Sequence, residues 1–238
     1  NFALTARREH WQSVPIVFAG RDERAAARAA AAGNATGVSL RLESAATIEF
    51  ARALFPRARH LALVGDRDLN ETYFQGFEGR LAGARGDLAV IDLRGLPMAQ
   101  VLERVAALPG DAIVHFSIFS VDGEGQRFIP RDALARIAAQ SNAPVFGDLD
   151  SYLATGAVGG RMTDIRAFGA GVAARVVPIL RGSDAGALEP GESSWSTPIV
   201  DWRALRRWGL DESGLPPGTE VRFRSPSLWE EHRGAVLG

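Results

Sequence analysis

The sequence predicts an α/β fold in which parallel sheets carry helices on both faces. Short apolar runs alternate with longer stretches of helical periodicity, and the runs recur at intervals of roughly thirty residues, the length of a strand–helix unit. With 46% hydrophobic residues in a chain of 238, the protein can bury a substantial core in one or two lobes.

Five apolar runs are candidate strands, because continuous runs of this length are typical of strands buried on both faces. They are residues 14–20, 59–65, 88–93, 112–117 and 144–147. Near the C-terminus, the strand-like residues 197–200 precede a short helix that holds Leu205 and Trp208, and residues 220–224 are extended.

The stretches between the runs have apolar residues three and four apart, which places them on one face of a helix. The four faces are Ile48, Ala51, Leu54 and Phe55; Tyr73, Phe77 and Leu81; Val101, Val105 and Leu108; and Leu134, Ile137 and Ala138. Ser44 and Pro130 stand where two of these helices are expected to start. Residues 164–180 predict one more amphipathic helix, closed by Gly182.

The C-terminal part also carries a family resemblance. The relevant segments are residues 193–210 (SSWSTPIVDWRALRRWGL), 215–221 (LPPGTEV) and 227–230 (SLWE). Their order resembles the extracytoplasmic substrate-binding proteins of ABC transporters, in the type I periplasmic-binding-protein-like group that also serves as sensor domains of bacterial histidine kinases. The resemblance extends over residues 14–230.

This resemblance implies two α/β lobes. We expect the first lobe to comprise residues 1–57 and 161–195, the second lobe residues 58–160, and residues 196–238 to form a C-terminal segment leading toward a membrane helix. Fewer strand–helix units precede residue 20 than the family's first lobe contains, so we expect that lobe to be truncated at its N-terminal side.

The resemblance implies recognition of a small-molecule ligand in the periplasm by a membrane-tethered sensor, with closure of the lobes on the ligand as the signal. The domain itself would then be no enzyme, although the full-length protein would be a histidine kinase. Two alternatives stay open: a free periplasmic substrate-binding protein of an ABC transporter, and an α/β enzyme that uses Asp148 as an acid or base.

Composition narrows the remaining function classes. A net charge of -1 gives no electrostatic case for a nucleic-acid partner, although all 27 basic residues are arginines. The chain has no cysteine, which removes disulfides and thiolate chemistry. Phosphate-loop, Gly-x-Ser-x-Gly and His-Glu-x-x-His motifs are missing too, so we expect neither a cofactor nor a metal. His60 and His115 fall in or beside strands, where satisfied structural histidines are the favoured interpretation.

Ligands of open α/β sheets bind beyond the carboxyl ends of the strands, so the residues that follow the strands are the candidate contacts. They are Gly20, Asp22, Asp66, Asp68, Ser117, Phe119, Asp122, Asp148 and Tyr152. Asp148 and Tyr152 are the strongest pair. A turn, a helix cap or a packed position is the competing interpretation for each of them.

Two further expectations concern the backbone. Gly159 and Gly160 are expected to form a hinge between the lobes or to allow a close approach of the two lobes. The strand predicted at residues 14–19 is expected at a sheet edge, which would favour a homodimer.

Overall fold

The computed structural model describes residues 13–20, 31, 33–66, 77–193 and 195–224. Its strands are β1 (Ile16–Gly20), β2 (Ala35–Leu40), β3 (His60–Val64), β4 (Ala89–Asp92), β5 (Ala112–Phe116), β6 (Val145–Gly147), β7 (Gly159–Thr163), β8 (Gly191–Ser193), β9 (Ser196–Asp201) and β10 (Glu220–Arg222). The helices are α3 (Ser44–Leu54), α5 (Phe77–Arg85), α6 (Met98–Ala106), α7 (Pro130–Gln140), α8 (Ile165–Leu180) and α9 (Trp202–Arg207), with 3-10 turns η1 (Asp150–Tyr152), η2 (Ala185–Ala187) and η3 (Glu212–Gly214). In this part of the chain no helix has the length and hydropathy to cross a membrane.

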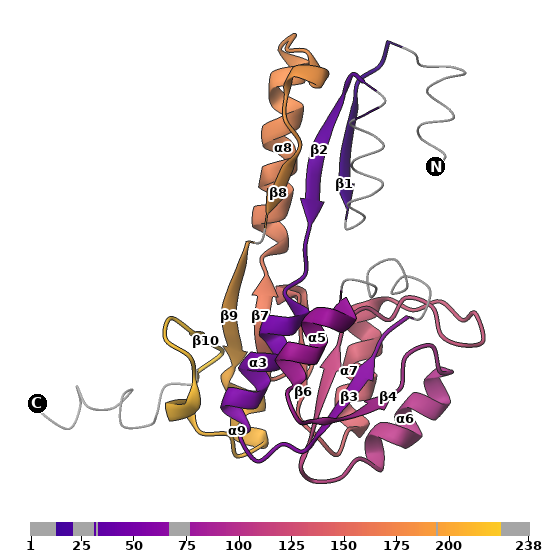
Figure 1. Cartoon of the computed structure of the whole chain (residues 1–238), viewed down its shortest axis with the longest axis vertical. Coiled ribbons are helices and arrows are strands. Elements are labelled where there is room, and N and C mark those ends of the chain that lie inside the picture. Colours follow the sequence, from indigo (N-terminus) through magenta and orange to yellow (C-terminus); the bar gives the residue numbers. More distant parts are fainter. Residues whose placement is uncertain (1–12, 21–30, 32, 67–76, 194, 225–238) are drawn as a thin grey trace, which may run out of the picture.

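The strands form two separate sheets, the smaller one above the larger one in Figure 1. The larger sheet has the order β10-β9-β7-β6-β5-β3-β4. Its neighbouring strands are parallel, except that β9 runs antiparallel to β7. The strands predicted at residues 59–65, 88–93, 112–117 and 144–147 are confirmed as β3, β4, β5 and β6, and the predicted α/β class is confirmed with them.

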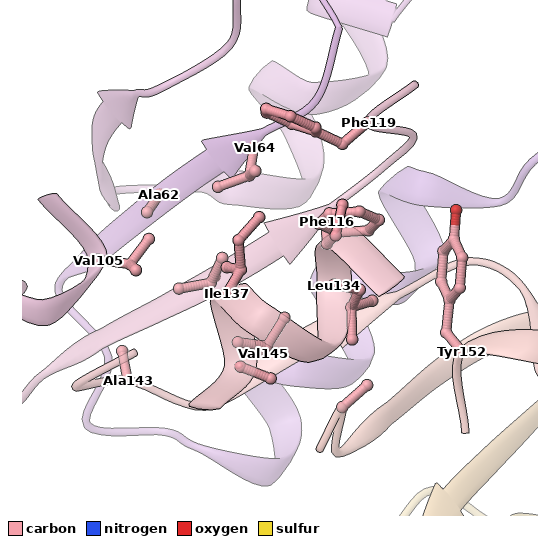
Figure 2. Packing of buried hydrophobic residues seen from close by; sticks show 14 of the residues in the cluster. Ala62, Val64, Val105, Phe116, Phe119, Leu134, Ile137, Ala143, Val145 and Tyr152 are labelled. Carbon is pink, nitrogen blue, oxygen red and sulfur yellow. The ribbon is translucent and has the colours of Figure 1, made fainter. Parts of the chain in front are cut away.

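Helices cover both faces of the larger sheet because its strands alternate their side chains between two cores. In β3, Ala62 and Val64 belong to a core that also contains residues of α6 and α7. Leu61 and Leu63 belong to a second core, shared with α3, α5 and α9. Figure 2 shows part of the first core, where Ile137 and Leu134 of α7 pack near the strands.

The smaller sheet has the order β1-β2-β8, and α8 packs along β2 and β1. The helix predicted at residues 164–180 is confirmed as α8, and the Asp164 carboxylate caps it by accepting from the Ala167 amide at 2.8 Å. Strand β2 has no counterpart among the predicted strands. All six of its residues are buried, but Thr, Gly and Ser interrupt its apolar pattern. A Cβ at Gly37 would lie 2.2 Å from the Phe18 carbonyl oxygen in β1, so this position requires glycine.

Within the described residues, the chain passes between the two sheets at three places: between β2 and α3, between β7 and α8, and between β8 and β9. We call them the first, second and third connecting segments. The first connecting segment precedes α3, whereas the boundary between the lobes was expected at residues 57 and 58, after that helix. The boundary lies earlier because α3 packs on the larger sheet against β6 and β7. Residues 196–222 do not form the separate C-terminal segment that was expected, because β9 and β10 belong to the larger sheet and extend it.

Candidate functional site

One edge of the larger sheet faces the smaller lobe, which consists of the smaller sheet and α8. Strands β3, β5, β6 and β7 are mutually parallel, so their carboxyl ends lie along the same edge. The chain leaves that edge after Thr163, the last residue of β7, and enters α8 in the smaller lobe (Figure 1). The carboxyl edge, where α/β sheets bind their ligands, is therefore the edge next to the connecting segments.

Six predicted contact residues lie at this carboxyl edge, and the structure places the side chains of all six in the interior. Their exposed fractions are 3% for Asp66, 4% for Ser117, 0% for Phe119, 7% for Asp122, 0% for Asp148 and 1% for Tyr152. In this conformation the six side chains support the loops of the edge.

Asp66 joins the loop after β3 to the loop after β5. Its amide donates to the Ile118 carbonyl at 2.7 Å. Its Oδ1 accepts from the amides of Ser120 at 2.7 Å and Val121 at 3.1 Å. A buried carboxylate that accepts from main-chain amides holds both loops in one arrangement, since breaking those bonds would leave a charge without water.

Asp122 joins the loop after β5 to the start of α6. Its Oδ2 accepts from the Met98 amide at 3.0 Å, and Oδ1 accepts from the amides of Glu124 at 3.0 Å and Gln126 at 2.9 Å. Burial raises the pKa of Asp122, but the bonds from these three amides, that of Met98 first, outweigh it and keep the pKa below its ordinary value. Asp122 thus serves as a capping carboxylate for α6 from a distant loop.

Tyr152 and Phe119 fill the core beneath these loops. The Tyr152 hydroxyl donates to the Ser117 carbonyl at 2.9 Å. Its ring meets Phe116 edge to face, with centroids 5.3 Å apart, and both rings are visible in Figure 2. Phe119 packs on Phe128 at 5.5 Å in the same geometry. Aromatic pairs of this kind fix the loops as a rigid floor.

Asp148 is the centre of a buried polar cluster. The Ser44 hydroxyl, on the first residue of α3, donates to Asp148 Oδ2 at 2.5 Å. His115 Nε2, from β5, lies 3.2 Å from Oδ1 and 3.1 Å from Oδ2. The predicted interpretation of His115 as a satisfied structural histidine is confirmed, and His60 likewise pairs with Asp111 at 2.8 Å.

The order of these groups does not match a nucleophilic triad. In a triad the histidine stands between the serine and the carboxylate and takes the serine proton. Here Asp148 stands in the middle, and the Ser44 hydroxyl donates to it directly. Exposed fractions of 2% for Ser44 and 3% for His115 also keep both groups away from a substrate. The cluster gives the enzyme alternative no geometric support.

The remaining predicted positions are elsewhere. Gly20 ends β1 in the smaller sheet and is exposed. Asp22 and Asp68 lie outside the described residues. Gly159 and Gly160 begin β7 inside the larger sheet, with φ of 148° and 157°. Gly159 serves neither as the expected hinge nor for an approach of the lobes, because a Cβ there would lie 2.1 Å from the Ile199 carbonyl oxygen in β9, the neighbouring strand of the same sheet.

Sequence reasoning missed the partners that Asp148 finds. Ser44 was expected as a helix cap, but the residue at the cap position is Glu43, and the Ser44 side chain turns to Asp148 instead. Sequence reasoning also missed the contact of Trp195, which packs on Phe168 of α8 with ring centroids 6.1 Å apart. No local signal marks these contacts, because Ser44 and Asp148 are 104 residues apart in the chain.

Within the ranges that the structure describes, no three His, Asp or Glu side chains are grouped to hold a metal ion. A pocket of 310 Å³ lies between α9 and η3, lined by Leu205, Arg206, Gly209, Leu210, Asp211 and Glu212. It belongs to the edge opposite the connecting segments, because β9 runs antiparallel to β7 and leads directly into α9.

No protein-family model matches the sequence, and no curated protein matches it either. Solved structures do match. A conserved domain protein from Vibrio cholerae O1 biovar El Tor is 18% identical, with a TM-score of 0.65 over 93% of this chain and 83% of that one. An ABC domain from Streptococcus pneumoniae, solved in complex with L-Trp, is 16% identical, with a TM-score of 0.67 over 88% of this chain and 72% of that one.

A third structure is a substrate-binding protein with adhesive properties from Clostridium difficile in its ligand-free, open form. It is 14% identical, with a TM-score of 0.58, and this chain spans 62% of its length. At such identities the likeness concerns the backbone alone. The chain shares the two-lobed α/β fold of these structures.

Proposed function

We propose that this protein binds a small solute between its two lobes, at the carboxyl edge of the larger sheet, and that closure of the lobes on the solute is its output. The observation that carries the proposal is the position of that edge next to the three connecting segments (Figure 1). A solute that contacts both lobes binds the closed form better and shifts the equilibrium toward it.

The chemistry of the carboxyl edge supports an amino acid or an aromatic acid as the solute class. Ile118, Ser120 and Val121 are only partly buried there, which offers apolar contacts beside a hydroxyl. Arg161, on β7 close to the second connecting segment, is exposed and could pair with a carboxylate. L-Trp, which the Streptococcus pneumoniae domain holds, has an apolar ring for the first contacts and a carboxylate for Arg161. It is therefore the first solute to test.

We further propose that the domain is extracytoplasmic and acts as the input domain of a membrane-tethered sensor. The support is the resemblance of residues 215–230 to the segment that leads from such input domains into the membrane. A free receptor of an ABC transporter is the alternative. The gene decides between them: an apolar span of about 20 codons downstream, followed by kinase motifs, supports the sensor, and a stop codon supports the free receptor.

Native mass spectrometry of freshly purified protein, together with thermal unfolding in the presence of single amino acids, aromatic acids, sugars and polyamines, tests solute binding. A true solute should raise the melting temperature saturably, since a ligand at 100 times its Kd stabilises the folded state by about 2.7 kcal/mol. The absence of both a retained mass and a thermal shift across the panel would contradict the proposal.

A further inference from the structure

The geometry points to a role for Asp148 that differs from ligand contact: we infer that Asp148 is a positioning residue that holds the three connecting segments in register and thereby sets the angle between the lobes. This inference depends on the proposed function only where it concerns the solute. The anchoring itself is a property of the chain and can be measured without one.

Asp148 holds the first connecting segment through its side chain. Ser44 is the residue at which the chain, having left β2, begins α3. Its hydroxyl donates to Asp148 Oδ2 at 2.5 Å, and the carboxylate is 0% exposed. Loss of this hydrogen-bond donor would leave a buried carboxylate oxygen with neither water nor a protein partner, which is strongly unfavourable. The bond therefore fixes where the first segment enters the larger lobe.

The main chain of Asp148 holds the second connecting segment. Its carbonyl accepts from the amide of Thr163, the last residue of β7, at 2.8 Å. The next residue is Asp164, whose side chain caps α8. The orientation of the α8 axis at its first turn is therefore tied to the same residue that holds the first segment.

The third connecting segment joins through Trp195. The Asp164 amide donates to the Trp195 carbonyl at 2.9 Å. The Trp195 ring also packs against α8, since a Cβ at Gly171 would lie 2.1 Å from its Cη2 atom. Displacement of any one segment would disturb this short chain of contacts from Asp148 to α8.

On the other side, Asp148 is tied to the floor of the proposed site. His115 of β5 contacts both carboxylate oxygens at 3.1–3.2 Å. Residues 117–122, which follow β5, are the loop that Asp66 and Asp122 hold at the carboxyl edge. A solute that moves the loops after β5 or β6 would thus act on Asp148 and, through it, on all three segments.

The test is the distance between the lobes in solution, measured by double electron–electron resonance. The natural chain has no cysteine, so Glu103→Cys on α6 and Ser183→Cys after α8, both exposed positions, give one spin label in each lobe. The variants are Ser44→Ala and Asp148→Asn in this background. Ser141→Ala and Asp201→Asn are matched controls, because they alter a buried serine and a buried carboxylate that contact neither the connecting segments nor the loop after β5.

We expect Ser44→Ala and Asp148→Asn to broaden the distance distribution or add a second population, while both controls keep the natural distribution. If Asp148→Asn fails to fold, as judged by circular dichroism, Ser44→Ala decides, since it removes only one hydroxyl. A folded Ser44→Ala protein with the natural distribution overturns the inference.

Adding L-Trp to the same labelled proteins separates the two proposals. Altered distributions in the variants without any response to the solute would support the anchor and count against L-Trp as the ligand. A response to L-Trp with identical distributions in all variants would support the proposed function and reject the anchor.

Discussion

Trp195 occupies the space beside Gly171 that any larger residue would need. A Cβ at Gly171 would lie 2.1 Å from Cη2 of the indole and 2.6 Å from Cζ2, although the two residues belong to different segments of the chain. The third connecting segment and α8 are therefore fitted to each other, and this fit is open to a sharp comparison within one helix.

Gly171→Ala should destabilise the protein by about 1 kcal/mol, because overpacking costs about 1–3 kcal/mol and outweighs the gain of about 1 kcal/mol from helix propensity. Gly169→Ala in the same helix is the matched control, since a Cβ there meets nothing within 4 Å. It should stabilise by about 0.5–1 kcal/mol. Urea unfolding of the two variants measures both, and equal stabilisation by both would refute the fit.

Gly159→Ala should be far more damaging. Its φ of 148° is unfavourable for alanine, and the new Cβ would collide with the main chain of β9 at the Ile199 carbonyl, which cannot rotate away. We expect a loss of about 3 kcal/mol or more in the free energy of unfolding. Gly110→Ala, where no atom lies within 4 Å of the Cβ, should stay within about 0.5 kcal/mol of the natural protein. A mild effect at Gly159 would show that β7 and β9 separate easily.

Tyr152→Phe distinguishes support from ligand contact. The variant loses the hydrogen bond to the Ser117 carbonyl and keeps the ring in the core, so we expect a loss of about 1 kcal/mol in stability. The Kd for any solute found in the thermal panel should stay unchanged, as measured by isothermal titration calorimetry. A large rise in Kd with unchanged stability would return Tyr152 to the list of ligand contacts.

Asp122 predicts a pH dependence. Its pKa is lower in the folded state than its ordinary value of 3.8, so the folded protein holds the ionised form more strongly than the unfolded chain does. The contribution to stability is therefore fully present above that ordinary value and is lost as the pH falls through the lower, folded-state pKa. Urea titrations between about pH 5 and about pH 3 should show a shallower decline for Asp122→Asn than for the natural protein. Parallel curves would mean that the hydrogen bonds from the three amides do not lower the pKa of Asp122.

The larger sheet was predictable because the burial of its strands and helices leaves a recognisable pattern of apolar residues in the local sequence. Strands β3, β5 and β6 are buried on both faces, which leaves continuous apolar runs, and α8 keeps its 3.6-residue periodicity. Strand β2 escaped the same reasoning, because its buried Thr36 and Ser39 break the run and its Gly37 has no side chain to show burial. Local patterns also could not predict that β9 lies beside β7 and β10 beside β9, since strand order is set by contacts between distant segments.

The candidate site shows the same division. The sequence by itself determined which residues follow the strands and therefore lie at the carboxyl edge, because strand ends are marked by local changes in polarity. Only the tertiary structure decided that Asp66, Asp122 and Asp148 face inward, and that Ser44 and His115 meet at Asp148. The direction of a polar side chain depends on whether a donor from elsewhere in the chain can satisfy its charge once it is buried, and such donors have no fixed spacing in the sequence.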